Sequence, residues 1–261
     1  MTYKTINNDV SRRINMTQNL LEKPLITITN VIWSFDAQTH DIKLLLIKRS
    51  DSPFKDFWAL PETWLRINES AHDATLRLVK EKLGLDLPDV HAEQLATFTD
   101  PSRSPEERAL SLSYMTFLPQ QPLLNPGPGA TDAQWFTLQK QKSGLFRFKN
   151  LDFVFTTLAD DDYINHKNQM ADKHLAFDHN WILTVATKRI MNKLNYQPTI
   201  LLILGPSFTL KMARHVFGVF GKTEPDNSNF LRNHQDLLQP LGASIQNKPG
   251  RPAKQYRLLI N

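Results

Sequence analysis

The C-terminal part of the chain is divided by glycine and proline into short segments. A Gly-Pro-Ser break at 205–207 precedes a segment whose apolar residues recur at helical spacing, and Gly221 ends that segment. The pattern predicts helices at 209–220 and 224–238, followed by strands at 243–246 and 255–260 that the loop NKPGRPAK joins. This order of elements restricts the C-terminal part to a small helical unit that ends in a β-hairpin.

Charge is distributed unevenly along the chain. Residues 181–261 hold 11 of the 31 Lys and Arg but only 3 of the 26 Asp and Glu. The remaining residues hold 20 basic and 23 acidic side chains, so an acidic front precedes a basic tail of domain size. Two helices, a hairpin and a basic charge are together typical of a winged helix-turn-helix that binds double-stranded DNA. A solvated basic surface is the alternative that charge alone leaves open.

The second helix of a helix-turn-helix enters the major groove, and its first residues meet the base edges. Asparagine and arginine make the bidentate contacts that distinguish adenine and guanine. This position selects as candidate base-reading residues Asn227, Ser228, Asn229, Arg232 and Asn233. For Asn229, the polarity that is common at a helix N-terminus is an equal alternative to base contact.

The hairpin loop supplies three cations, Lys248, Arg251 and Lys254, between prolines that stiffen it. We expect Arg251 to enter the minor groove, and a solvated surface loop is the alternative. Near the helix ends, Thr209, Lys211 and Lys222 are candidates for phosphate contacts, which position the domain without reading sequence.

The front of the chain alternates strand and helix patterns. A helix is expected between about 68 and 83, because its apolar residues follow helical spacing and Gly84 supplies a C-cap. Runs of β-branched and apolar residues predict strands at 25–35, 42–48, 93–99, 110–118 and 133–138. Further helices are expected at 139–148, 150–159 and 177–195, and a strand or linker at 196–204.

The segment 60–85, LPETWLRINESAHDATLRLVKEKLGL, resembles the Nudix box, G-x5-E-x7-R-E-U-x-E-E-x-G-U, in which U is aliphatic. Aligning Glu69 with the first Glu of the box gives the expected residue types at Arg77, Val79, Glu81, Gly84 and Leu85. The same register places Thr63 at the leading Gly, and Leu78 and Lys82 at two of the Glu positions. The box is therefore damaged at three positions.

These departures affect the chemistry of the motif. Nudix hydrolases hold Mg²⁺ or Mn²⁺ on carboxylates three and four residues apart on one helix face. Here Glu81 remains, whereas Leu78 cannot bind a metal and the Lys82 ammonium would repel one. We therefore expect no metal, no cofactor and no hydrolysis. A chance match to an amphipathic helix, with Arg77 and Glu81 as an ordinary surface pair, is the alternative.

The whole chain resembles the NrtR family, the Nudix-related transcriptional regulators of NAD metabolism. The resemblance is carried by SDSPFKDFWALP, the damaged box, DPSRSPEERALSLSYMTFLP, GATDAQWFTL, LAFDHNWIL, FTLKMARHVFGVFG, NSNFLRNH and GRPAKQYRL. It implies an α/β fold, with a Nudix-like α/β/α sandwich around a mixed sheet followed by a winged helix-turn-helix. It also implies a dimer that binds palindromic operator DNA and is released by ADP-ribose or a related nucleotide or phosphosugar.

The resemblance divides the chain into four regions: an N-terminal arm at 1–24, a Nudix-like sensor domain at 25–160, a linking helical segment at 161–198 and the winged helix-turn-helix at 199–261. It places Arg49, Lys55 and Arg103 in loops that face a phosphate, although each alone also fits a surface cation. The changed turn at 62–64 puts the identity of the ligand in doubt, because the same loop lines the diphosphate pocket.

Composition adds three exclusions. The chain has no cysteine, so neither a disulfide framework nor a thiolate zinc site can form. No segment has the length of apolar sequence that a membrane span or a signal peptide needs, which favours a cytoplasmic protein. No pair of histidines has the spacing of metal ligands.

Two other functions compete with a ligand-responsive repressor. One is a Nudix-type ADP-ribose pyrophosphatase with an auxiliary nucleic-acid-binding tail. The other is a nucleotide-sugar binding module whose basic tail contacts a protein. The sequence leaves open the operator, the effector and whether the regulator represses or activates.

Overall fold

The computed structural model describes residues 23–85, 92–159, 174–221, 223–243 and 253–259. It has a nine-stranded sheet and a small three-stranded sheet. The large sheet has the strand order β5-β6-β1-β2-β7-β8-β9, with β3 paired to β2 and β4 paired to β1. Its first strands are β1 (Leu25–Phe35), β2 (Ile42–Arg49), β3 (Trp58–Ala59) and β4 (Glu62–Trp64). The others are β5 (Ala92–Phe98), β6 (Ala109–Leu118), β7 (Ala130–Lys140), β8 (Phe146–Asn150) and β9 (Phe153–Thr156).

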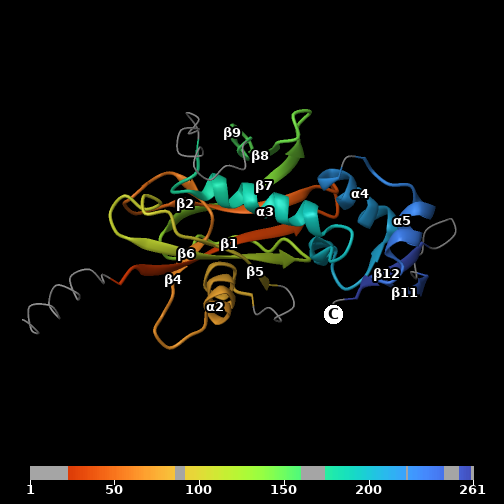
Figure 1. The fold of residues 1–261 in the computed structure, drawn as a ribbon, viewed down its shortest axis with the longest axis horizontal. Coiled ribbons are helices and arrows are strands. Elements are labelled where there is room, and N and C mark those ends of the chain that lie inside the picture. The colour runs from red at the N-terminus through yellow and green to blue at the C-terminus, as the bar shows by residue number, and fades with distance from the viewer. Residues whose placement is uncertain (1–22, 86–91, 160–173, 222, 244–252, 260–261) are drawn as a thin grey trace, which may run out of the picture.

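The sheet is mixed, because β1 and β6 run parallel whereas its other pairs are antiparallel. A helix covers each face: α2 (Ala71–Leu83) lies on one and α3 (His179–Lys193) on the other (Figure 1). Successive residues of a strand face opposite sides of a sheet. Accordingly Ile32 packs with Leu78 of α2, whereas Val31 and Trp33 lie in the cluster that includes Ile182 of α3. The expected α/β/α sandwich with a mixed sheet is confirmed.

Helix α2 ends where the sequence predicts, at Leu83, and begins at Ala71, three residues after the predicted start near 68. Ser70 accepts a hydrogen bond from the Asp73 amide, and the Asp73 carboxylate accepts one from the Ser70 amide, which forms a capping box. At the other end Gly84 adopts φ 69° and its amide bonds to the Lys80 carbonyl.

A winged helix unit forms the C-terminal end of the molecule (Figure 1). Its elements are the 3-10 helix η3 (Thr199–Leu204), β10 (Phe208–Thr209), α4 (Leu210–Phe220), α5 (Asn227–His234), β11 (Leu238–Ala243) and β12 (Lys254–Leu258). Strand β12 pairs with β10 on one side and β11 on the other, so the hairpin is attached to the residues that open α4. This arrangement confirms the predicted winged helix-turn-helix.

The predicted helices at 139–148 and 150–159 are wrong. The chain there forms the end of β7, then β8 and β9, which pair as a meander. The physical reason is an alternation that favours strands: Phe146, Phe148 and Phe155 are buried, whereas Arg147 and Lys149 between them are exposed. Rings from outside the two segments pack on them: Phe220 on Phe146, Trp33 on Phe148 and Phe136 on Phe155.

Two element boundaries and the secondary structure of one segment near the C-terminus also differ from expectation. The second helix of the unit ends at His234 rather than near 238, and the first hairpin strand begins at Leu238 rather than at 243, whereas residues 244–246 of the predicted strand lie outside the described residues. Pro240 and Gly242 lie where its pairing with β12 shifts register, which is where a strand tolerates such residues. The segment 196–204, for which a strand or linker was expected, contains a 3-10 helix at 199–204 that is buried throughout.

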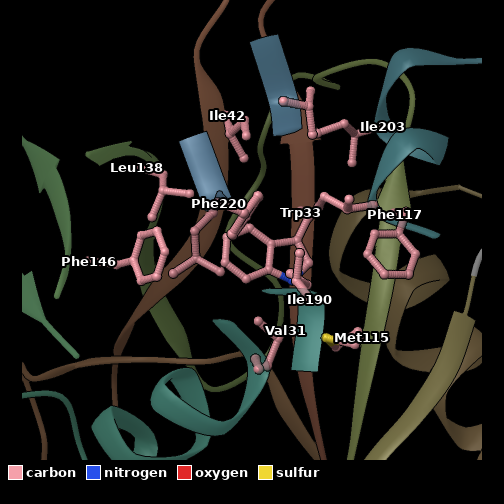
Figure 2. Close-up of a cluster of buried hydrophobic side chains, with 14 of the residues drawn as sticks. Val31, Trp33, Ile42, Met115, Phe117, Leu138, Phe146, Ile190, Ile203 and Phe220 are labelled. Carbon is pink, nitrogen blue, oxygen red and sulfur yellow. The ribbon is translucent and has the colours of Figure 1, made fainter. Parts of the chain in front are cut away.

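The two units share one continuous hydrophobic core. Figure 2 shows Phe220 of α4 lying against Trp33 of β1, with Ile190 of α3 and Ile203 of η3 beside them. The ring of Phe220 lies 5.5 Å from that of Phe146, measured between centroids. The winged helix is therefore packed on the end of the sandwich rather than tethered to it by an extended linker.

Candidate ligand pocket and nucleic-acid interface

A cleft of about 390 Å³ opens where β2, β4 and the C-terminal half of α2 meet the loop at 99–108. Its charged lining residues are Arg49, Asp51, Glu62, Glu81, Lys82, Arg103, Glu106 and Glu107. Trp64 and Phe177 add aromatic surface. A cleft of this size, with charged side chains beside aromatic surface, suits a small ligand that carries polar groups.

The damaged Nudix box forms one wall of this cleft. Glu81 and Lys82 line it, whereas Leu78, one turn earlier, is fully buried in the cluster with Val79 and Ile32. The Lys82 ammonium donates to the carbonyl of Pro128, which also lines the cleft. Burial lowers the pKa of Lys82, and Glu81 opposes that shift.

Arg77 holds the helix to the turn that precedes it. Its guanidinium donates to Glu69 at 2.7 and 2.8 Å, to Glu81 at 3.0 Å and to the Trp64 carbonyl at 2.9 Å. The hydrogen bonds from Arg77 are the main reason that the pKa of Glu69 falls to about 2. Arg77 is therefore a structural partner of the helix.

Arg103, which lines the cleft, is held by two carboxylates. Its Nε and Nη2 donate to the Asp178 carboxylate at 3.1 and 3.0 Å, in the bidentate geometry of a strong ion pair. Glu62 Oε2 lies 3.9 Å from the same guanidinium. The Arg103 side chain is 2% exposed and that of Asp178 is 6% exposed, so water screens this pair poorly.

His179 lies beside this pair in a defined tautomer. Its Nδ1 accepts a hydrogen bond from the Leu60 amide at 3.0 Å, so the proton of the neutral ring is on Nε2. That Nε2 lies 3.8 Å from Glu62 Oε2. Burial alone would raise the pKa of Glu62, but His179, Arg103 and a hydrogen bond from Thr29 together hold it at about 2.

The other two predicted ligand residues differ in position. Arg49 lies at the cleft, where its Nε donates to the Pro53 carbonyl at 2.9 Å and its guanidinium lies 4.8 Å from the Phe177 ring. Lys55 is exposed in the loop after β2 and is not among the residues that line the cleft. The structure therefore brings Arg49 and Arg103 to one cleft and leaves Lys55 outside it.

Within the described ranges, no group of three or more His, Asp or Glu side chains is arranged to hold a metal ion. In the same residues, none of the helices is long and apolar enough to cross a membrane.

Helix α5 presents a polar first turn to solvent. Asp226 caps it by accepting from the Asn229 amide at 2.9 Å, which satisfies one of the free donors at its start. Phe230 and His234 face inward against Phe217 of α4, with ring centroids 4.8 Å from it. Because the aromatic face fixes the helix on α4, its opposite face is directed to solvent.

The five predicted base-reading residues are all exposed on this face, but they differ in their partners. Asn227 accepts from Arg214 at 2.6 Å, and Asn229 donates to Asp226 and accepts from Arg232. The pairing of Asn229 supports its alternative role as a helix-start residue. For Ser228 and Asn233 the described contacts show no such bond.

The predicted phosphate-contacting residues and the three cations of the hairpin loop differ in their surroundings. Thr209 caps α4 by accepting from the Met212 amide at 3.3 Å, and Lys211 is exposed in the first turn of that helix. Lys254 is exposed at the start of β12. Three further residues, Lys222, Lys248 and Arg251, and the arm at 1–22 lie outside the described residues. The roles of all of them stay predictions.

Sequence reasoning missed the group formed by Glu62, Asp178 and His179. A signal for part of it was present, because an Asp directly before an apolar helix pattern indicates an N-cap. No local pattern connects Asp178 to Arg103, which is 75 residues away in the sequence.

Residues 26–155 match the model of the NUDIX domain, and residues 200–258 match that of the NrtR DNA-binding winged helix domain. The chain belongs to the NrtR family. Its pocket and its exposed helix α5 therefore lie in the two domains that this family combines.

Among known proteins, the ADPR responsive transcriptional repressor NtrR of Acinetobacter baylyi is 24% identical over 242 residues, which are 91% of this chain and 83% of that protein. A MutT/nudix family protein from Enterococcus faecalis superposes with a TM-score of 0.79 at 28% identity, over 99% of this chain and 100% of that one. Shewanella oneidensis NrtR in complex with a 27mer DNA has a TM-score of 0.64 at 24% identity, over 90% and 93% of the two chains.

Proposed function

We propose that this protein is a transcriptional repressor that binds operator DNA through α5 and the β11–β12 wing and is released by ADP-ribose. The single observation that carries the proposal is the exposed, capped helix α5 in a winged helix unit that shares its core with a Nudix-like domain. The family match and the similarity to a repressor that responds to ADP-ribose support both halves of it.

The Nudix-like domain is proposed to bind its ligand without hydrolysing it. Of the carboxylates that the box uses for a metal, Glu81 lines the cleft, whereas Leu78 is buried in the core and Lys82 is bound to the Pro128 carbonyl. A lone carboxylate near an ammonium is a poor site for Mg²⁺, which prefers several oxygen ligands. A ligand that stays intact persists as a signal.

The region boundaries follow from the same proposal: an arm at 1–24, a sensor at 25–160, a linking segment at 161–198 and a DNA-binding domain at 199–261. We propose that two chains form a homodimer on a palindromic operator, because winged helices that bind as dimers read two half-sites.

A DNA-binding regulator of this kind acts in the cytoplasm, where the genes it controls are accessible.

The test is fluorescence anisotropy with labelled DNA from the region upstream of the protein's own gene and its neighbours. We expect specific binding with a steep dependence on salt concentration and release by ADP-ribose. A scrambled duplex of the same length is the control. Equal affinity for both duplexes would refute DNA recognition, and Mg²⁺-dependent hydrolysis of ADP-ribose would favour the pyrophosphatase instead.

A further inference from the structure

Three consecutive residues at the start of α3 each lie against a residue that lines the cleft. The pairs are Phe177 with Arg49, Asp178 with Arg103, and His179 with Glu62. The start of α3 is therefore the underside of the pocket, and a ligand that moves any of these side chains also acts on the helix.

Asp178 occupies the N-cap position of α3 but does not cap it. Its carboxylate makes no hydrogen bond to the helix amides, and its ψ of 21° lies far from the extended values of capping residues. The other α-helices of the described residues all have side-chain caps with ψ between 155° and 163°, at Ser70, Thr209 and Asp226. Arg103 occupies both oxygens of the Asp178 carboxylate, which explains the missing cap.

The far end of α3 reaches the winged helix. The helix has 15 residues, which corresponds to about 22 Å. Its Ile190 lies in the cluster around Trp33 and Phe220 that joins the two units (Figure 2), and α3 contacts α4 directly. One rigid element therefore connects the floor of the pocket to the first helix of the DNA-binding unit.

We propose that Arg103 is a coupling residue, which Asp178 holds in the free protein and the phosphates of the nucleotide ligand capture in the complex. Its capture frees Asp178 to turn to an extended backbone and cap α3, and this change at the start of α3 shifts the winged helix. This inference rests on the proposed function, because it describes how the same pocket acts on DNA binding.

The chemistry of the cluster favours an exchange of partners. Arginine binds carboxylate and phosphate through the same two-pronged geometry, so a phosphate can replace Asp178 without changing the kind of bond. In the unliganded cluster, the Arg103 guanidinium faces two carboxylates, those of Asp178 and Glu62. A phosphate would repel both, and the movement of Asp178 to the helix amides relieves that repulsion and places its negative charge at the positive end of the α3 dipole.

The decisive variant is Asp178→Ser in the full-length chain. Serine is an effective N-cap, but it is too short and uncharged to hold the Arg103 guanidinium. The variant therefore favours the proposed liganded arrangement without ligand. Two quantities are measured: the Kd for ADP-ribose by calorimetry, and the Kd for operator DNA with and without saturating ADP-ribose by anisotropy.

We expect Asp178→Ser to bind ADP-ribose about tenfold more tightly, because the ligand no longer competes with a carboxylate. DNA binding without ADP-ribose should weaken about tenfold, so the factor by which ADP-ribose weakens DNA binding becomes much smaller. Arg103→Gln should instead weaken the binding of ADP-ribose at least tenfold. A merely structural role for the ion pair would not change the two affinities in opposite directions.

Arg108→Gln is the matched control, because Arg108 lies in the same loop and donates to the backbone carbonyl of Thr99 at 2.9 Å instead of to α3. Asp178→Asn, which keeps the shape of the side chain, provides a second test if Asp178→Ser melts early. If ADP-ribose releases wild-type protein and both Asp178 variants by the same factor, the inference fails alone. If ADP-ribose does not release the wild type, the proposed function fails with it.

Discussion

Phe220 of α4 lies edge-on to Trp33 of β1, with ring centroids 6.1 Å apart and ring planes at 82°. One residue comes from the DNA-binding unit and the other from the centre of the large sheet, and both are almost fully buried. The contact joins the interiors of the two units, so we expect them to unfold together, because neither can expose its ring without disturbing the other.

Phe220→Ala should lower the free energy of unfolding by about 3–5 kcal/mol, because it leaves a cavity on both sides of the junction. Urea denaturation followed by tryptophan fluorescence measures the loss. The wild-type protein should unfold in one transition. The control is Leu123→Ala, at a side chain that is 93% exposed, which should stay within about 0.5 kcal/mol of wild type. Equal effects of the two variants would show that the junction adds no stability.

Lys140 of β7 should stabilise the C-terminal end of α4. Its ammonium donates to the carbonyls of Phe220 and Gly221, which lack helical partners. Lys140→Met should cost about 0.3–1 kcal/mol of stability, the usual contribution of a cation at a helix C-terminus. Thermal denaturation compares it with Lys142→Met, at an exposed position two residues away. A loss no larger than that of the control would contradict this role.

Glu62 should make the protein acid-sensitive. The pKa of Glu62 is about 2 in the folded protein and 4.5 as an unperturbed group. The ionised carboxylate therefore adds to the free energy of unfolding fully above about pH 4.5, and this stabilisation is lost as the pH falls toward 2. This difference in pKa corresponds to about 3 kcal/mol in the free energy of unfolding. In urea denaturation as a function of pH, Glu62→Gln should be destabilised at pH 7 and should lose less stability than wild type between pH 4.5 and 2.

The control for the acid titration is Glu106→Gln, at the exposed rim of the same cleft. Its stability should follow the wild-type curve over the whole pH range. A Glu62→Gln curve parallel to that of wild type would contradict the assignment of the acid-sensitive step to Glu62.

Lys211 and Asn233 should affect DNA binding in different ways. If Lys211 contacts a phosphate, Lys211→Ala weakens binding to all duplexes alike and reduces the slope of log K against log salt by about one. If Asn233 reads a base, Asn233→Ala costs about 1–3 kcal/mol on the operator and relaxes the preference at one base pair. Lys149→Ala in β8 is the control. Identical salt slopes and sequence preferences for all three variants would refute both assignments.

Local sequence signals predicted α2 and α4 because both helices carry their own ends. Ser70 and Gly84 bound α2, and Thr209 opens α4 with a hydrogen bond to an amide three residues away. Each of these signals acts over a few residues, so it can be recognised without knowing the fold. The same holds for β1, whose β-branched run is a strand in any buried sheet.

The helices predicted at 139–148 and 150–159 were wrong although the alternation of aromatic and charged residues at 146–149 favours a strand, because so short a pattern gains its stability from partners elsewhere. Strand β8 is stabilised by its hydrogen bonds to β7. Strand β9 is stabilised by two aromatic contacts, of Trp58 with Phe153 and of Phe136 with Phe155. Those partners come from other parts of the chain. A prediction that weighs each segment alone cannot include them.

The sequence by itself determined the two domains, their order and the damaged box, because helix caps, strand periodicity and charge distribution are encoded over short spans. Only the tertiary structure decided that Arg103 faces Asp178 rather than solvent, and that Phe220 packs on Trp33. Burial and ion pairing between residues far apart in the chain depend on where the sheet brings them, and no local pattern records that placement.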